Sequence, residues 1–200
     1  MSKKMIFIRH CKASMEGKDE ERVLDKDGIA QASSLCKKLN SILKPNSEIY
    51  SSPFTRAVES LKPLTKLNSQ IDIKESKFLE EIVIPKDANL TKHQIIEKMW
   101  EDPDYYIGKG LSQNKHYDLI KDDLNKLYKN FLENNNDYII VTHGNLLGMI
   151  IKFLFKIDFG YKDWKIMSMP DLYILDFDSE NKLIDYKRDI KDIQNIFQIK

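Results

Sequence analysis

The sequence has few of the residues from which common cofactor and metal sites are built. Its 200 residues include seven glycines, which form neither a dinucleotide-binding fingerprint nor a phosphate-binding P-loop. The four histidines lack the His-Glu-x-x-His spacing of zinc enzymes, and no acidic run resembles a calcium loop. The two cysteines, Cys11 and Cys36, are too few for a four-sulfur zinc site or a disulfide framework. We therefore expect catalysis without a metal or an organic cofactor.

The chain also lacks an excess of charge and any long apolar run. It has 32 lysines and arginines against 31 aspartates and glutamates, so no broad basic surface for duplex nucleic acid is expected. The apolar stretch at residues 5–8 is too short for a signal-peptide core, and Lys152 interrupts the run at 146–155. These features predict one globular domain over residues 1–200, neither exported nor embedded in a membrane. The scarcity of cysteine favours a reducing, cytoplasmic setting.

Short apolar runs alternate with helical patterns along the chain. The predicted strands are residues 5–8, 48–51, 71–73, 138–141, 172–175 and 182–186. The predicted helices are residues 27–43 with Asp27 as N-cap, a segment opened by Ser52-Pro53 with a kink before Pro63, residues 94–100 and residues 117–131. This alternation predicts an α/β fold, a three-layer α/β/α sandwich with a mostly parallel central sheet. The two late strands are expected to pair antiparallel at one edge.

Cationic and hydrogen-bonding side chains follow three of the predicted strands. Arg9 and His10 come directly after the first strand. Arg56 lies shortly after the second strand, and His143 follows the strand at 138–141. Ligands of open α/β sheets bind beyond the carboxyl ends of the strands, so these side chains are expected to meet at one rim. Taken singly, an arginine at a strand end is more often a surface ion-pair partner, and a histidine after an apolar strand is more often a structural residue.

A helix that begins at Gly144 adds free N–H groups and a dipole suited to an anion. Two arginines, two histidines and such a helix end at one rim predict a phosphate site in a nearly neutral protein. His93 and His116 lack this context and are expected to have surface or packing roles.

Five short segments stand out in order along the sequence: Ile8-Arg9-His10-Cys11-Lys12-Ala13, Leu24 to Ala32, Ser51-Ser52-Pro53-Phe54-Thr55-Arg56-Ala57, Leu79-Glu80-Glu81-Ile82 and Val141-Thr142-His143-Gly144-Asn145. Together they resemble the motifs of the histidine phosphatase superfamily, which has the phosphoglycerate mutase-like fold. The segment from Phe159 to Tyr173 is similar to small bacterial members. Any one motif is weak, but five in sequence are specific.

The resemblance implies roles for the residues at these positions. His10 would be the nucleophile that takes up the phosphoryl group, because a neutral imidazole has an available lone pair. Arg9, Arg56, His143 and Gly144 would bind the phosphate oxygens, with His143 also counted among the catalytic residues because it stabilises charge in the transition state.

A carboxylic acid would protonate the leaving oxygen and then activate water against the phosphohistidine. Glu81 fits this position of the family pattern, with Glu80 as the alternative register. An ordinary acidic turn is the competing interpretation.

The sequence departs from the family pattern beside the nucleophile and after the acid. Cys11 stands where glycine or alanine is usual, and it is expected to be a small residue that fits. A second hypothesis gives Cys11 redox sensitivity, provided that nearby arginines lower its pKa. Lys12-Ala13 lacks the threonine or serine of many sugar-phosphate members, and residues 82–85 replace a Gly-x-Trp-Glu-Gly stretch.

The favoured hypothesis is a metal-independent phosphatase that hydrolyses phosphomonoesters through a phosphohistidine on His10. The alternatives are a 2,3-bisphosphoglycerate-dependent phosphoglycerate mutase, a non-catalytic phospholigand-binding domain and a phosphohistidine-protein phosphatase. Residues 84–115 are predicted to form a cap-like excursion that covers the pocket and selects a small phosphorylated substrate. No nucleic-acid or membrane partner is expected, and the sequence leaves both a monomer and a homodimer open.

Overall fold

The computed structural model describes residues 2–188, which divide into two compact units. The first unit holds the residues up to 80, residues 130–143 and those from 168 onward; the second holds residues 81–129 and 144–167. The strands, all in the first unit, are β1 (Lys3–Arg9), β2 (Glu48–Ser51), β3 (Ile73–Glu75), β4 (Tyr138–Thr142), β5 (Asp171–Phe177) and β6 (Leu183–Arg188).

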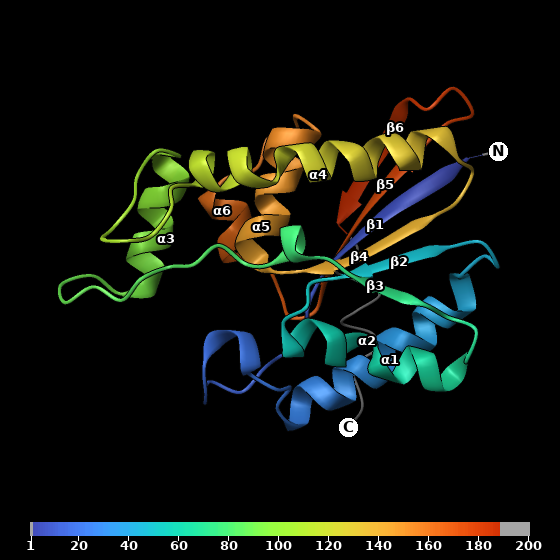
Figure 1. Cartoon of the computed structure of the whole chain (residues 1–200), viewed down its shortest axis with the longest axis horizontal. Coiled ribbons are helices and arrows are strands. Elements are labelled where there is room, and N and C mark those ends of the chain that lie inside the picture. The colour runs from blue at the N-terminus through green and yellow to red at the C-terminus, as the bar shows by residue number, and fades with distance from the viewer. Residues whose placement is uncertain (1, 189–200) are drawn as a thin grey trace. The chain divides into compact units, whose positions relative to one another are not determined.

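These strands form one mixed sheet in the order β3-β2-β4-β1-β5-β6 (Figure 1). The pairs β1–β4, β2–β4 and β2–β3 are parallel. β5 pairs antiparallel with both β1 and β6, and β6 forms the edge. The predicted α/β fold with a mostly parallel sheet is confirmed, as is the antiparallel pairing of the two late strands.

The central strands have continuous apolar runs because both of their faces are covered. Residues 5–8 of β1 and 138–141 of β4 are all buried, as parallel strands in the middle of a sheet must be. Lys3, at the start of β1, is buried as well and donates hydrogen bonds from Nζ to the carbonyls of Phe131, Leu132 and Asn134. This ammonium therefore satisfies carbonyl groups at the end of a helix, where the backbone has no partner of its own.

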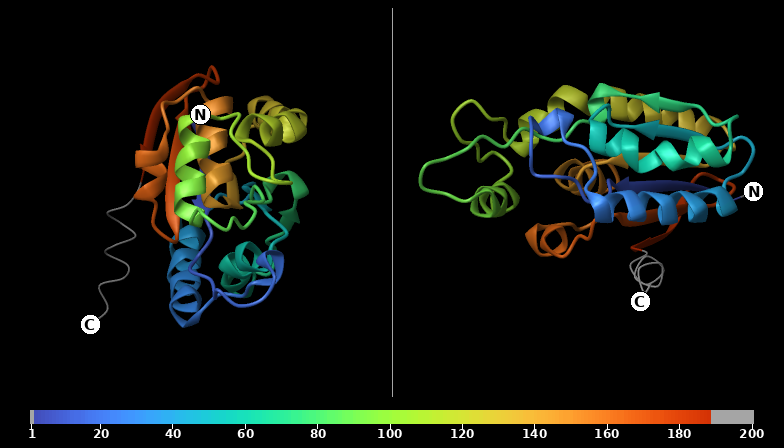
Figure 2. Two further views of the ribbon diagram at one scale, coloured as in Figure 1. Left: turned by 90° about the vertical axis from the view of Figure 1, so that its left-hand side faces the viewer. Right: turned by 90° about the horizontal axis from the view of Figure 1, so that it is seen from below.

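α1 (Lys26–Ile42) and α2 (Thr55–Leu67) lie side by side and share an apolar core with the sheet (Figure 1, Figure 2). Asp25, rather than the predicted Asp27, caps α1, because its carboxylate accepts the N–H of Gly28 at 2.8 Å. A Cβ on Gly28 would lie 1.9 Å from the carbonyl oxygen of Lys12. Glycine is thus required where the start of α1 approaches the segment after β1.

The start and the course of α2 differ from the prediction. The helix begins at Thr55, and the hydroxyl of Ser52 does not cap it. α2 also continues through Pro63, so of the kink or break expected near residues 61–62 the break does not occur. Proline removes one N–H donor, but the fully buried Leu61 and Leu64 continue the apolar stripe on either side of it. Packing of that stripe against α1 keeps the helix whole.

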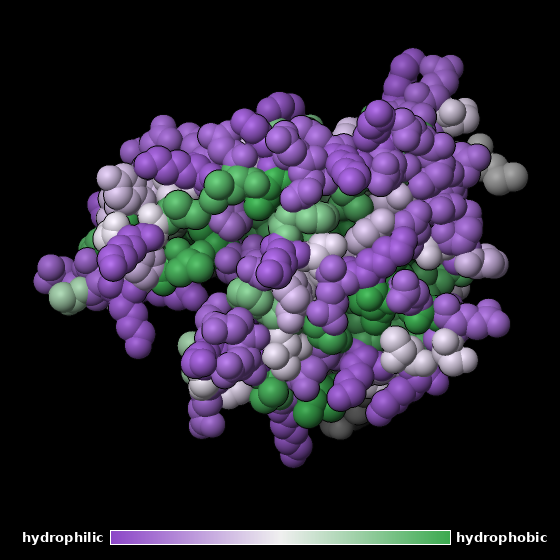
Figure 3. All heavy atoms as spheres, in the orientation of Figure 1, coloured by the Kyte–Doolittle hydropathy of each residue, from purple (hydrophilic) through white to green (hydrophobic). Residues whose placement is uncertain are grey.

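The second unit is helical and has a small apolar core of its own around Ile82, Ile95 and Met99. Its elements are α3 (Lys92–Glu101), the larger part of α4 (Gln113–Glu133), α5 (Gly144–Met149), a π-helical turn (Ile150–Leu154) and α6 (Tyr161–Lys165). Helices predicted at 94–100 and 117–131 are therefore present, each a few residues longer. Hydrophilic side chains predominate along α4 in the space-filling view (Figure 3), as its amphipathic pattern requires. Within residues 2–188, no helix combines the length and the apolarity that a membrane crossing requires.

Candidate active site

His10 directly follows β1 and is 6% exposed. Its backbone N–H donates to the carbonyl of Thr142 at 3.0 Å, which continues the pairing of β1 with β4 by one residue. The ring Nδ1 lies 2.7 Å from the carbonyl oxygen of Cys11. Because a carbonyl oxygen only accepts, this contact places the hydrogen on Nδ1 and leaves the lone pair on Nε2. Nε2 is therefore the ring nitrogen of His10 that carries the lone pair.

Arg56 is held in the first turn of α2 and is 2% exposed. Its Nε donates to Nε2 of His10 at 3.0 Å. The same guanidinium contacts Asp19, with Nη2 3.2 Å from the carboxylate and Nη1 donating to the backbone carbonyl. The ring of Phe54 lies under it, 4.9 Å from the guanidinium carbon. The planar guanidinium of Arg56, with its several N–H donors, is thus fixed beside the lone pair on Nε2 of His10.

His143 follows β4 and is fully buried. Its ring centroid lies 5.1 Å from that of His10, edge to face. Nε2 of His143 lies 2.8 Å from the hydroxyl of Ser52, whereas its buried Nδ1 has no hydrogen-bond partner among residues 2–188. Ser52 is itself placed by its backbone N–H, which donates to the carbonyl of Val141 at 2.9 Å. The predicted His10, Arg56 and His143 are therefore brought together, with Ser52 as a partner that sequence analysis assigned to a helix cap.

The two buried histidines share an electropositive environment. Burial, reinforced by the guanidinium of Arg56, lowers the pKa of His10 well below its usual value. Burial also lowers the pKa of His143, with further contributions from His10 and Arg56. Arg9 and Arg22 act in the same direction on both rings. Both imidazoles are consequently neutral at neutral pH, so Nε2 of His10 carries a lone pair, which accepts the hydrogen bond from Arg56, rather than a proton.

Two arginines flank this group, and only one of them was predicted. Arg9 ends β1, and its Nη1 lies 3.4 Å from the carbonyl oxygen of Ser168. Arg22, which sequence analysis missed, forms an ion pair with Asp19. The segment that carries Arg22 returns toward β1 because Ala13 and Leu24 form an antiparallel bridge. A single bridge of this kind leaves no periodic signal in the sequence.

Glu81 lies at the start of the second unit, and its carboxylate binds the first turn of α5. Oε2 accepts the N–H of Asn145 and Oε1 that of Leu146, both at 3.1 Å. The sequence predicted that the free N–H groups of this helix, which begins at Gly144, bind an anion. Because Glu81 and Gly144 belong to the second unit, their roles beside His10 stay predictions. Between the two possible acids, Glu81 rather than Glu80 makes the contacts with α5.

A family model now adds independent information to this geometry. Residues 5–189 match the model of the histidine phosphatase superfamily (branch 1). The chain belongs to this superfamily. The resemblance found in the five sequence segments is confirmed.

Several solved structures match this chain over nearly its whole length. YhfR of Bacillus stearothermophilus has a TM-score of 0.73 at 19% identity, covering 96% of this chain and 99% of that one. A phosphoserine phosphatase of Entamoeba histolytica, in complex with 3-phosphoglyceric acid, has a TM-score of 0.70 at 18% identity, with coverages of 96% and 99%. A mycobacterial glucosyl-3-phosphoglycerate phosphatase has a TM-score of 0.69 at 17% identity, with coverages of 94% and 98%. At these identities the likeness shows the shared fold. A comparison with curated protein sequences gives no match.

Cys11, the residue that departs from the superfamily motif, faces the apolar core. Its side chain is fully buried with Leu35 and Cys36, and burial raises its pKa to about 12. The redox hypothesis required the opposite shift, so its premise is wrong. The backbone N–H of Cys11 donates to the hydroxyl of Ser60 at 2.8 Å. Cys11 therefore acts as a small apolar residue that lets the segment after β1 pack on α2.

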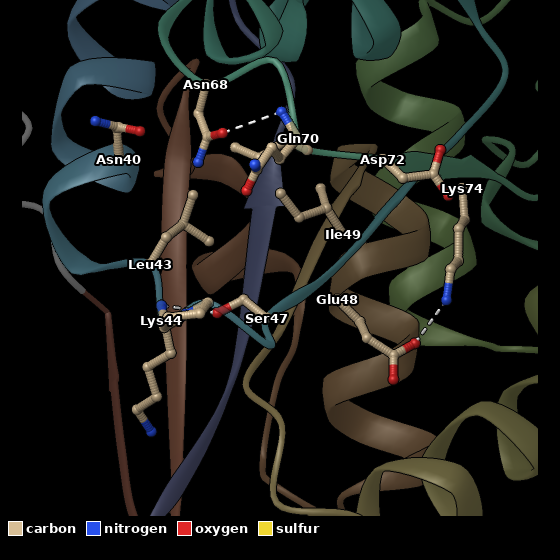
Figure 4. A pocket seen from close by; sticks show the side chains of 12 residues that line it. Asn40, Leu43, Lys44, Ser47, Glu48, Ile49, Asn68, Gln70, Asp72 and Lys74 are labelled. Atoms are coloured by element: carbon tan, nitrogen blue, oxygen red, sulfur yellow. Dashed lines mark hydrogen bonds and ion pairs between the residues drawn. The ribbon is translucent and has the colours of Figure 1, made fainter.

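A hollow of about 440 Å³ lies at the other end of β2 from the superfamily's catalytic motifs. Glu48 and Lys74 form an ion pair across part of it, and Asn68 and Gln70 are hydrogen-bonded on another side (Figure 4). None of the predicted site residues is among those that line it. Residues 2–188 also contain no group of three histidine, cysteine or acidic side chains able to hold a metal ion.

Proposed function

We propose that this member of the histidine phosphatase superfamily is a metal-independent phosphatase that hydrolyses phosphomonoesters through a phosphohistidine on Nε2 of His10. One observation carries the proposal: His10 is buried, its Nδ1 contacts the Cys11 carbonyl, and its Nε2 faces the Nε of Arg56 at 3.0 Å. The nucleophilic lone pair thus lies beside a guanidinium, the group best suited to hold a phosphoryl oxygen. Membership of the superfamily supports the same reaction.

The reaction has two steps that conserve atoms and charge. Nε2 of His10 attacks phosphorus in line, the bond to the leaving oxygen breaks, and Glu81 gives that oxygen a proton. Water then attacks the phosphohistidine, Glu81 takes its proton, and the N–P bond breaks to release phosphate. Arg9, Arg56 and His143 bind the equatorial oxygens and stabilise their charge in both transition states.

The tautomer of His143 suits this task. In the proposed mechanism the Ser52 hydroxyl, 2.8 Å from Nε2, donates its hydrogen to that nitrogen, which places the ring hydrogen on the buried Nδ1. Nδ1–H is then a donor for a phosphoryl oxygen even though the ring is neutral. This arrangement binds an anion without adding a further positive charge that would lower the nucleophilicity of His10.

The substrate is proposed to be a small phosphorylated molecule in a cytoplasmic setting. Two solved structures with the same fold are named as phosphatases of phosphoserine and of glucosyl-3-phosphoglycerate, which supports a substrate of this size. Residues 84–115 are proposed to act as a cap that selects the leaving group within a single functional domain. No nucleic-acid or membrane partner is proposed, and sedimentation would distinguish a monomer from a homodimer.

The test is hydrolysis of p-nitrophenyl phosphate in EDTA by the parent, His10→Ala and His93→Ala. His93 is the control because its ring packs on Trp164 in the second unit. Turnover that survives EDTA and His93→Ala but disappears in His10→Ala is expected. Turnover by His10→Ala would overturn the mechanism. An inactive parent that interconverts phosphoglycerates after priming with 2,3-bisphosphoglycerate would establish the mutase instead.

A further inference from the structure

A loop of nine residues, 14–22, lies between the first strand and the first helix and returns to the site. Its base is closed by the Ala13–Leu24 bridge and by a hydrogen bond of 2.9 Å from the N–H of Ser14 to the carbonyl of Val23. Gly17 turns the loop with a φ of +86°, a conformation that favours glycine. The loop then forms a 3-10 turn, Asp19–Glu21. We call residues 14–22 the acidic strap.

Asp19 of the acidic strap contacts two arginines, Arg56 and Arg22, that both lower the pKa of His10 and His143. One carboxylate oxygen lies 3.2 Å from Nη2 of Arg56, and the other forms an ion pair with Nη2 of Arg22. The backbone carbonyl of Asp19 accepts from Nη1 of Arg56. The Asp19 side chain is 50% exposed, whereas that of Arg56 is 2% exposed. A half-exposed carboxylate thus contacts a buried guanidinium.

Phosphate and carboxylate compete for such a guanidinium because both offer two oxygens to its N–H fork. Arg56 reaches the nucleophile through Nε, so a phosphoryl group placed for attack by His10 needs the remaining donors of the same guanidinium. Asp19 contacts both terminal nitrogens: its backbone carbonyl accepts from Nη1, and its carboxylate lies 3.2 Å from Nη2. A phosphoryl oxygen bound at Nη2 would therefore lie against this carboxylate, and the two anions would repel each other strongly.

We propose that Asp19 is an internal competitor of the substrate, whose carboxylate binds Arg56 and Arg22 and is displaced by the phosphoryl group. This proposal rests on the proposed function, because it takes Arg56 as the phosphate-binding residue. Displacement costs the same for every phosphoryl ligand, so Asp19 weakens the apparent affinity for substrate and for product phosphate alike. The acidic strap therefore promotes the release of product phosphate. It also prevents weakly binding phosphoryl ligands from occupying the site.

The experiment is calorimetric titration of inorganic phosphate into the parent, Asp19→Asn, Asp19→Ala and Glu20→Gln. Glu20 is the matched control: it is exposed on the same 3-10 turn, so its replacement removes one charge at a similar place. Because the ion pair joins an exposed carboxylate to a buried arginine, both Asp19 variants are expected to bind phosphate about five- to tenfold more tightly than the parent. Glu20→Gln should bind it as the parent does.

Phosphate binding that is unchanged or weaker in both Asp19 variants would overturn the proposal, as would equal tightening in Glu20→Gln. Hydrolysis of p-nitrophenyl phosphate by the same parent sample separates this failure from failure of the proposed function. A parent that turns over substrate while Asp19→Asn gains no affinity refutes the competitor alone. Absence of both turnover and phosphate binding in all four proteins refutes both proposals.

Discussion

Replacing Ser52 with alanine isolates the contact that orients His143. The change removes a hydroxyl that lies 2.8 Å from Nε2 of His143 and 3.3 Å from the N–H of Phe54. Both groups are buried or partly buried, so leaving them without a partner costs about 1–2 kcal/mol of unfolding free energy. For a chain of this length, that corresponds to a fall in melting temperature of roughly 2–8 °C.

The catalytic effect of Ser52→Ala should exceed the effect on stability. Without the serine hydroxyl, Nδ1 of His143 no longer carries its hydrogen in a defined tautomer, and one donor to the transition state weakens. Loss of about one such hydrogen bond predicts a fall in kcat of roughly tenfold or more. The assay is steady-state hydrolysis of p-nitrophenyl phosphate together with a thermal melt of each protein.

Ser51→Ala is the matched control for this experiment. Ser51 is equally buried, and its hydroxyl donates to the backbone carbonyl of Ser52 at 2.9 Å without contacting His143. Its replacement should lower the melting temperature by a similar amount and leave kcat within about twofold of the parent. Equal losses of kcat in the two variants would refute the assignment of Ser52 as a positioning residue.

Four further predictions concern the charge and proton balance of the molecule. Arg56→Lys keeps the charge but loses the fork, so kcat should fall about 100- to 1000-fold; a kcat near that of the parent would contradict the transition-state role. Glu81→Gln should retain a burst of one nitrophenolate per enzyme, since that leaving group needs no acid, and then turn over slowly in stopped-flow traces; unchanged steady turnover would exclude the role as base. Because the folded-state pKa of both His10 and His143 is lowered, the unfolded chain takes up protons first, so the free energy of unfolding should fall as pH drops below about 6.5. Urea titrations at pH 7.5 and 5.5 should show a smaller fall in His143→Ala than in the parent, and equal falls would argue against this linkage. Lys3→Met leaves three backbone carbonyls without their ammonium partner and should lower the unfolding free energy by about 1–3 kcal/mol with kcat unchanged; an unaltered urea midpoint would count against that contact.

The central strands and the family were determined by the sequence because their signals are local, whereas the strand predicted at 71–73 forms instead at Ile73–Glu75. The runs at 5–8 and 138–141 are apolar at every position, as strands covered on both faces must be, and both form in the structure. His10 and His143 then follow those strands directly, so parallel pairing of β1 with β4 brings them to the same edge. Five motifs in fixed order were sufficient to predict the superfamily.

Tertiary structure decided the features that depend on long-range contacts or on competition between neighbouring residues. Asp25 and Asp27 both suit an N-cap, and only the backbone path shows that Asp25 reaches Gly28. Ser52 was assigned to a helix cap because its partner, His143, lies 91 residues away.

The surroundings of His10 also depend on long-range contacts. Burial in the α1–α2 core raises the pKa of Cys11, although the sequence places that thiol next to arginine and histidine. Asp19 and Arg22 belong to no motif. Asp19 contacts Arg56, and Arg22 contacts Asp19, because the Ala13–Leu24 bridge and the Ser14–Val23 hydrogen bond fold their loop back. Local pattern therefore determined the elements and the position of His10, the proposed nucleophile, whereas the partners that surround its ring were decided by contacts between distant parts of the chain.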